Sequence, residues 1–233
     1  MNNADHKDLR DRPIRTFGRT GGRALSPRQQ ALFDTRLDHW RVPPPLPAQF
    51  APDSLFAGAP PVWLEIGFGG GEHLVAQAGV HPEVGFIGCE PFVEGVAKAI
   101  AGIEDNQLAN VRLWPDDARL LLEALAPASI ARTFILFPDP WPKRRQQKRR
   151  LVQPAFLNAL ARVLAPGAAV RFATDVASYA DEALLAVLSS GQFDWTAERA
   201  DDWRLAPADH VTTRYETKKL GDCAPVFLDF QRR

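Results

Sequence analysis

The sequence is poor in cysteine and has no long apolar stretch. Cys89 and Cys223 are too few for a disulfide framework or a cysteine-rich zinc site, so both are expected to be small apolar residues in a reducing compartment. No apolar run approaches the roughly 18 residues needed to cross a bilayer. The first residues, MNNADHKDLR, lack the apolar core of a signal peptide. We therefore expect a protein outside the membrane, in the cytoplasm.

The chain also lacks a net charge, because 28 Lys and Arg residues balance 28 Asp and Glu residues. The cations are unevenly distributed, however. Seven lie between residues 7 and 28, and six lie in the eight residues from Lys143 to Arg150, so an anion can be bound regionally. The five histidines show no metal-ligand set. His73 is expected to be a core or surface residue, and no metal is predicted.

The 233 residues, 45% of them hydrophobic, suffice for one α/β domain with an appendage. Seven prolines between residues 42 and 61 separate an N-terminal arm, 1–60, from a patterned domain, 61–233. Within the arm, Ser26-Pro27 predicts the start of a short helix with Leu32, Phe33 and Leu37 or Trp40 on one face. We expect this helix to dock on the domain.

Apolar strands alternate with helical patterns from residue 62 onward, which predicts a parallel sheet with right-handed crossovers. Strands are expected at VWLEI, VGFIGC, VRLW, FILF and AAVRFAT, followed by an antiparallel pair, FDWTAE and PVFLDFQ. Helices are expected from Gly71, after Phe92, from Asp116, from about Leu151 to Leu164 and from Val176 to Ser190.

A glycine-rich turn follows the first strand and opens a helix. Gly67 and Gly69 allow a ligand to approach backbone amides and the helix N-terminus. The dinucleotide fingerprint needs a small residue where Glu72 stands, so the match to it fails. Glu65 places a negative charge beside the turn, which favours a cationic or zwitterionic ligand over a pyrophosphate. A tight turn without a ligand is the alternative.

Acidic residues also follow the next two strands. Glu90 lies 23 residues after Gly67, a spacing at which a carboxylate meets ribose hydroxyls. After the third strand, Asp116 is expected to cap the following helix and Asp117 to contact a ligand such as an adenine amino group. The alternative for each acid is a solvated or capping side chain at the end of a strand.

The fourth strand, FILF, ends at Pro138-Asp139-Pro140-Trp141, because proline cannot extend the sheet. Asp139 is therefore expected just beyond the carboxyl end of a buried strand, where open α/β sheets bind ligands. The basic cluster follows directly. The alternative is a polar turn before a solvated basic helix.

Together, the glycine turn and the acids resemble class I S-adenosylmethionine-dependent methyltransferases. The resemblance rests on Glu65 to Gly71, Glu90, Asp117 and Asp139-Pro140-Trp141. It implies an α/β, Rossmann-like, doubly wound sheet of seven mostly parallel strands with a closing antiparallel strand. It also implies S-adenosylmethionine as cofactor, bound by Glu65, Gly67, Gly69, Glu90, Asp117 and Asp139.

Further motifs are similar to those of the bacterial tRNA (guanine-N7)-methyltransferase family: PDPWPK before KRR, Ala173-Thr174-Asp175, Thr213-Arg214-Tyr215-Glu216 and, in the arm, Phe17-Gly18-Arg19. The resemblance implies a guanosine in the tRNA variable loop as substrate. It implies substrate contacts at Lys143, Asp175, Thr213, Arg214, Tyr215 and Glu216. Gln146 and Gln147 depart from members with histidine in the basic turn.

The chemistry agrees with this resemblance, because guanine N7 carries an in-plane lone pair and needs no general base. Asp139 is the expected catalytic residue, stabilising the charge that appears on the base. Trp141 either stacks on a base or packs the loop. Phosphate contacts are expected from Arg144, Arg145, Lys148, Arg149 and Arg150.

Two other functions stay open at this point: a methyltransferase acting on protein or a small molecule, and a non-catalytic RNA-binding module. The expected partner is tRNA, and the chain is expected to be a monomer or a homodimer.

Overall fold

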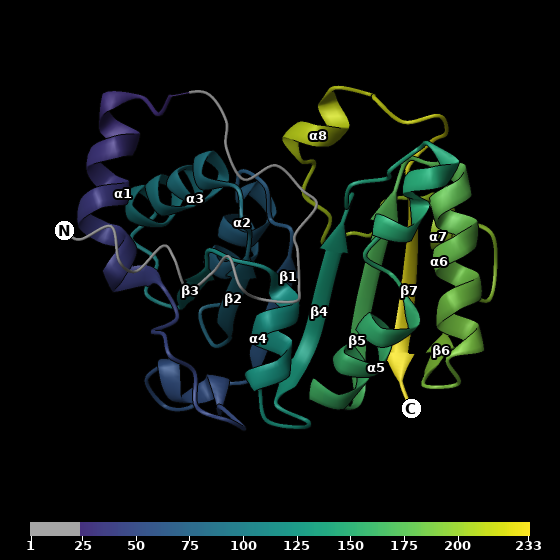
Figure 1. Cartoon of the computed structure of the whole chain (residues 1–233), viewed down its shortest axis with the longest axis horizontal. Coiled ribbons are helices and arrows are strands. Elements are labelled where there is room, and N and C mark those ends of the chain that lie inside the picture. The colour runs from purple at the N-terminus through teal and green to yellow at the C-terminus, as the bar shows by residue number, and fades with distance from the viewer. Residues whose placement is uncertain (1–23) are drawn as a thin grey trace.

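The computed structural model describes residues 24–233, so the Phe17-Gly18-Arg19 motif lies outside the described residues. The described chain forms a sheet with helices on both faces (Figure 1). Its strands are β1 Val62–Ile66, β2 Gly85–Cys89, β3 Val111–Trp114, β4 Ile130–Leu136, β5 Leu164–Thr174, β6 Phe193–Trp195 and β7 Val226–Arg232. Its α-helices are α1 Pro27–Trp40, α2 Glu72–Val80, α3 Val93–Asp105, α4 Ala118–Ala124, α5 Pro154–Val163, α6 Ala177–Ser189, α7 Asp201–Arg204 and α8 Arg214–Thr217. Two 3-10 helices, η1 Pro52–Leu55 and η2 Arg144–Arg149, complete the described elements.

The sheet has seven strands in the order β3-β2-β1-β4-β5-β7-β6. Strands β1 to β5 are parallel, and β7 runs antiparallel to both β5 and β6. The predicted fold class, including the closing antiparallel pair, is confirmed. Since β1 pairs with β2 on one side and β4 on the other, the strand order reverses at β1 and β4. Ligands of open α/β sheets bind at the carboxyl ends of such strands.

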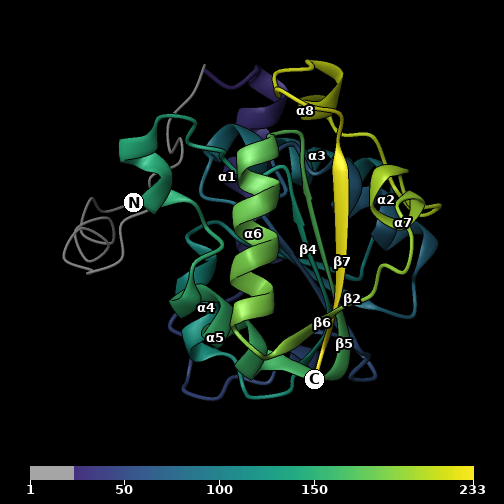
Figure 2. The same ribbon diagram turned by 90° about the vertical axis from the view of Figure 1, so that its right-hand side faces the viewer.

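Two helical layers cover the sheet (Figure 2). Helices α4, α5 and α6 cover one face, where Leu121, Phe156 and Tyr179 join the main apolar cluster. Helices α2 and α3 cover the other face over β1 to β3. On that second face, β4, β5 and β7 are covered by the chain between β6 and β7, which includes α8 and contributes Tyr215.

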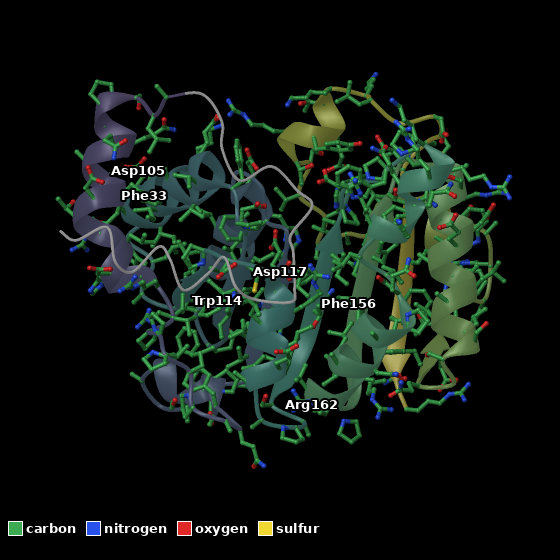
Figure 3. The ribbon with its side chains drawn as sticks, in the orientation of Figure 1. Phe33, Asp105, Trp114, Asp117, Phe156 and Arg162 are labelled. Carbon is green, nitrogen blue, oxygen red and sulfur yellow. The ribbon has the colours of Figure 1, made fainter. Side chains whose placement is uncertain are left out.

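The arm helix docks on the domain as the sequence predicted. Ser26 caps α1 in a capping box with Gln29. Leu32, Phe33 and Leu37 pack on the apolar cluster that holds α3, and Figure 3 shows Phe33 beside Asp105 at the end of α3. Trp40, at the end of α1, is buried.

Several boundaries differ from the sequence prediction. Strand β4 is Ile130–Leu136 instead of FILF, strand β6 ends at Trp195 instead of Glu198, and helix α4 begins at Ala118 instead of Asp116. Helix α5 begins at Pro154 instead of Leu151, because a proline disfavours the helical conformation of the residue before it, and Gln153 is extended, with φ −124° and ψ 159°. The amides of Leu151 and Val152 donate to the Tyr179 hydroxyl, at 3.0 and 3.4 Å. Strand β5 begins at Leu164 instead of Ala168, since Leu164 already pairs with Ile130 before an irregularity in the register.

An ion network holds the segment before α8 on the sheet. Arg171 of β5 donates to Asp229 of β7 at 2.8 Å and also pairs with Asp209. Arg132 of β4 donates to the other Asp209 oxygen at 2.8 Å. The Gln77 side chain of α2 donates to the Asp209 carbonyl at 2.7 Å. The chain therefore enters α8 from a fixed point on the sheet.

Candidate active site

The glycine turn between β1 and α2 is pressed against α3. Gly67, Gly69 and Gly71 all have positive φ, at 79°, 56° and 82°, which side chains rarely adopt. A Cβ on Gly95 of α3 would lie 2.1 Å from the Gly69 carbonyl oxygen. A Cβ on Gly67 or Gly69 would instead meet no described atom within 4 Å. Helix α3 therefore fixes the turn on one side, and on the other side the space beside Gly67 and Gly69 is open.

Glu90 holds this turn from the end of β2. Its carboxylate accepts from the Gly69 amide at 2.9 Å and from the Phe92 amide at 3.0 Å. Burial raises the pKa of Glu90 to about 7, against the two amide hydrogen bonds, and the charges of Asp139 and Glu65 add to the rise. The carboxylate is therefore partly protonated near neutral pH before any ligand arrives.

Glu65 is buried next to a histidine. Only 4% of Glu65 and 2% of His73 is exposed. His73 Nδ1 lies 2.7 Å from Glu65 Oε2, and the His73 ring packs edge-on against Phe134 at 4.6 Å. The sequence interpretation of His73 as a plain core or surface residue missed this pair. The signal was its position, eight residues after Glu65 in the first turn of the next helix.

Asp117 takes the capping role that the sequence assigned to Asp116, so that prediction is wrong. Its carboxylate accepts from the Arg119 amide at 2.9 Å, as the N-cap of α4, and from the Arg119 guanidinium. Asp116 accepts from the Asp117 amide at 2.7 Å. Figure 3 shows Asp117 near Trp114, well away from Arg162 at the lower edge. Because Arg119 already donates to both oxygens of the Asp117 carboxylate, a ligand that contacts Asp117 must bind the carboxylate together with Arg119.

The loop after β4 is tightly bent. Phe137 and Trp141, on either side of Asp139, have positive φ values of 50° and 42°. The Phe137 amide donates to the Ala173 carbonyl at 2.8 Å, which fixes the loop to β5. Asp139 is exposed. The Arg149 guanidinium lies 5.0 Å from the centre of the Trp141 ring, so Trp141 packs within the loop and basic segment.

Arg150 is a correction to the predicted phosphate contacts, because its side chain is completely buried. It donates to the Pro140 carbonyl at 2.8 Å, to Ser178 and to Glu182 at 2.7 Å. A guanidinium so enclosed is not available to a phosphate. It ties the Asp139 loop to α6 instead.

Asp175, at the end of β5, is also buried. The Tyr215 hydroxyl donates to the Asp175 carboxylate. Burial is the largest cause that raises the pKa of Tyr215 to about 12, and the negative charge of Asp175 is the next. Asp175 does not cap α6, since the Ala177 amide donates to Asp222 at 2.8 Å. Asp175 instead faces α8.

Helix α8 is a capped turn over the site rather than an irregular polar loop. Thr213 and Glu216 form a capping box, and Glu216 also contacts His210 Nε2 at 2.8 Å. The Tyr215 ring stacks on Phe137 at 5.7 Å between centroids. Arg214 lies 3.8 Å from Glu72, at the start of α2. In Figure 1, α8 lies above the carboxyl end of β4.

The predicted site residues thus gather at one edge of the sheet. Asp139 and Glu65 both act on the pKa of Glu90, and Asp139 and Asp175 both act on that of Tyr215. The pKa of Cys89 is raised first by burial and then by the negative charges of Asp117 and Glu90. Asp117 therefore lies at the same edge of the sheet as Glu90. Next to this acidic centre, η2 exposes Arg144, Arg145 and Lys148, preceded by exposed Lys143.

Among residues 24–233, no group of three or more His, Cys, Asp or Glu side chains could hold a metal ion. Nor is any helix in that range both long and apolar enough to cross a membrane.

Comparisons with known proteins define the class. Residues 59–227 match the family model of putative methyltransferases. The fold is similar to that of the 16S rRNA methyltransferase KamB, with a TM-score of 0.53 and 15% identity over 77% of this chain and 91% of that one. It is also similar to the 16S rRNA (adenine(1408)-N(1))-methyltransferase from Catenulisporales acidiphilia, with a TM-score of 0.52 and 13% identity over 92% and 96%. The chain is a methyltransferase with the class I fold.

Curated relatives narrow the class. The tRNA (guanine-N(7)-)-methyltransferase of Hyphomonas neptunium is 58% identical over 94% of this chain and 100% of that protein. Those of Caulobacter vibrioides and Rhodospirillum rubrum are 55% and 47% identical over 94% of this chain, and over 96% and 88% of their own lengths. The chain belongs to the tRNA (guanine-N(7)-)-methyltransferase family, as the sequence motifs predicted.

Proposed function

We propose that the chain transfers a methyl group from S-adenosylmethionine to N7 of a guanosine in the variable loop of tRNA. The observation that carries the proposal is the meeting of two features at one sheet edge. One is the open glycine turn with Glu65 and Glu90, and the other is the Asp139 loop, whose charge acts on Glu90. The names of the relatives support the choice of substrate.

The residues at the turn fit the cofactor. The space beside Gly67 and Gly69 is open, so an adenosine derivative can lie against the backbone of the turn. Glu65 suits the ammonium group, Glu90 the ribose hydroxyls and Asp117 the adenine amino group. An acidic centre also suits a sulfonium cation. When bound, S-adenosylmethionine supplies an electrophilic methyl group.

The protein's part in the reaction is to position the guanine and stabilise charge. N7 attacks through its own lone pair, so no side chain has to remove a proton first. Holding the two reactants in line can contribute roughly 7 to 11 kcal/mol. As the methyl group arrives, the guanine becomes cationic, and the charge of Asp139 stabilises it. We assign the guanine contacts to Asp175 and Tyr215, which are joined by a hydrogen bond, and to Lys143, Thr213, Arg214 and Glu216.

The proposed function is tested by incubating the purified protein with bulk tRNA and labelled cofactor, then mapping the methylated nucleosides by mass spectrometry. N7-methylguanosine at one variable-loop position is the expected product. Labelling that persists in cell extract after RNase treatment would point to a protein or small-molecule acceptor and contradict the proposal. Cofactor binding without any methyl transfer would favour a non-catalytic RNA-binding module.

The raised pKa of Glu90 predicts that cofactor affinity increases with pH. Ribose hydroxyls donate to the ionised carboxylate, so binding at a pH below about 7 must release a proton from Glu90. From pH 6 to pH 8, the Kd of S-adenosylhomocysteine should fall by about tenfold, as expected for one titrating group. Titration calorimetry in buffers of different ionisation enthalpy measures both affinity and proton release. Glu90→Gln is the control and should lose this dependence; a wild-type Kd that stays constant would contradict the assignment.

The exposed cations of η2 should supply phosphate contacts. Changing Arg144, Arg145 and Lys148 to Gln is expected to weaken tRNA binding and to reduce its salt slope by roughly 2 to 3, at about 0.7 to 0.9 for each lost contact. Arg233→Gln, an exposed cation at the opposite end of the sheet, is the control (Figure 1). Filter binding between low and moderate salt measures the slopes. Equal salt slopes for the triple variant and the wild type would contradict the phosphate contacts and would show that the cations of η2 are only solvated.

A further inference from the structure

The buried pair of Glu65 and His73 requires an explanation, because a carboxylate enclosed in protein is costly unless it is hydrogen-bonded. Acidic groups also gather near Glu65, because Glu65 and Asp139 each raise the pKa of Glu90 and therefore each repel its carboxylate. His73 supplies a donor to Glu65 at 2.7 Å.

The direction of this hydrogen bond follows from the chemistry of the two groups. An ionised carboxylate only accepts, so His73 Nδ1 carries the proton and donates to Glu65 Oε2. His73 is the second residue of α2, so its ring and the Glu65 carboxylate lie on the two sides of the glycine turn that joins β1 to α2. A carboxylate can accept through both of its oxygens, so with Oε2 engaged by His73 the Oε1 atom can accept from a second donor.

The His73 ring is itself held in place. It is 2% exposed and packs edge-on against Phe134 of β4. Since β4 pairs with β1 at Glu65 and Phe134, the donor and the carboxylate are fixed to the same part of the sheet. The orientation of Glu65 is therefore set by packing before any ligand binds.

We infer that His73 is a positioning residue, which engages one oxygen of Glu65 so that the other accepts from the ammonium group of the cofactor. This inference rests on the proposed cofactor contact of Glu65. A merely structural His73 would stabilise the fold without favouring any particular part of the cofactor. A positioning His73 affects only ligands that carry the amino-acid part.

Two ligands separate these roles: S-adenosylhomocysteine, which has the amino-acid part, and 5′-methylthioadenosine, which lacks it. His73→Phe keeps an aromatic ring against Phe134 but removes the donor. We expect it to weaken S-adenosylhomocysteine binding by about tenfold, as for loss of one charged hydrogen bond, and 5′-methylthioadenosine binding by less than about twofold. His73→Asn, whose amide can reach the same position, should restore affinity to within about threefold of wild type.

Glu65→Gln completes the test as a double-mutant cycle. If His73 acts through Glu65, adding His73→Phe to Glu65→Gln should weaken S-adenosylhomocysteine binding no further. Additive losses, equal losses for both ligands, or wild-type affinity in His73→Phe would overturn the inference. Wild-type protein that bound neither ligand would overturn the proposed function as well. Calorimetry at one pH measures every arm without tRNA.

Discussion

Replacing Asp139 with Asn is expected to lower single-turnover methylation of tRNA by about 100-fold, which corresponds to roughly 2.7 kcal/mol of transition-state stabilisation. Asn keeps the size of the side chain and one acceptor oxygen but removes the charge. Because the charge matters most when the guanine becomes cationic, both ligands should still bind. The measurement is the rate at saturating tRNA and cofactor, after mixing and chemical quench.

Asp181→Asn is the control for this prediction. It removes an exposed carboxylate from α6 without changing a proposed contact. Its rate should equal that of the wild type. A general-base role for Asp139 predicts something else, a log-linear loss of rate as the pH falls below the carboxylate pKa. An Asp139→Asn rate within threefold of wild type would remove Asp139 as the catalytic residue.

Replacing Gly95 with Ala should reduce cofactor affinity by at least about 100-fold, because overpacking this contact forces backbone to move. The added Cβ would lie 2.1 Å from the Gly69 carbonyl oxygen and 3.2 Å from Glu90 Cγ. Neither is the free end of a flexible side chain. The turn, or the start of α3, must therefore shift, and with it the Gly69 amide that binds Glu90.

Gly79→Ala is the matched control, since Gly79 is also a helical glycine but its Cβ would approach only Leu108, at 4.0 Å. Ala there should leave affinity unchanged and raise stability by up to about 1 kcal/mol. Calorimetry with S-adenosylhomocysteine gives the affinities, and thermal unfolding shows whether each variant is folded. A folded Gly95→Ala protein with wild-type affinity would mean that the turn tolerates the shift.

The sequence predicted most of the strand ends, because buried parallel strands are apolar runs that stop at Gly, Pro or an acid. Glu65, Glu90 and Asp139 could therefore be assigned to one edge of the sheet without coordinates. The isolated glycine at position 95 was a weaker signal. A glycine within a helical pattern indicates close packing, but the pattern does not name its neighbour.

Long-range contacts were not accessible in this way. Arg150 has the same local pattern as its basic neighbours, yet its side chain is enclosed by Pro140, Ser178 and Glu182. Asp116 and Asp117 were equally good caps by residue type, and the geometry of the chain entering α4 selected Asp117. The role of such a side chain depends on the residues that the fold brings next to it from other parts of the chain.

The sequence by itself determined the α/β fold, the glycine turn and the family, because each is encoded in short segments by periodicity, glycine and proline, or by residues in a fixed order. Only the tertiary structure decided that His73 serves Glu65, that Arg150 holds the Asp139 loop and that Tyr215 meets Asp175. Tyr215 and Asp175 lie far apart along the chain, and the crossing of β7 beside β5 brings them together. Contacts of this kind follow from strand order and packing, which no local pattern contains.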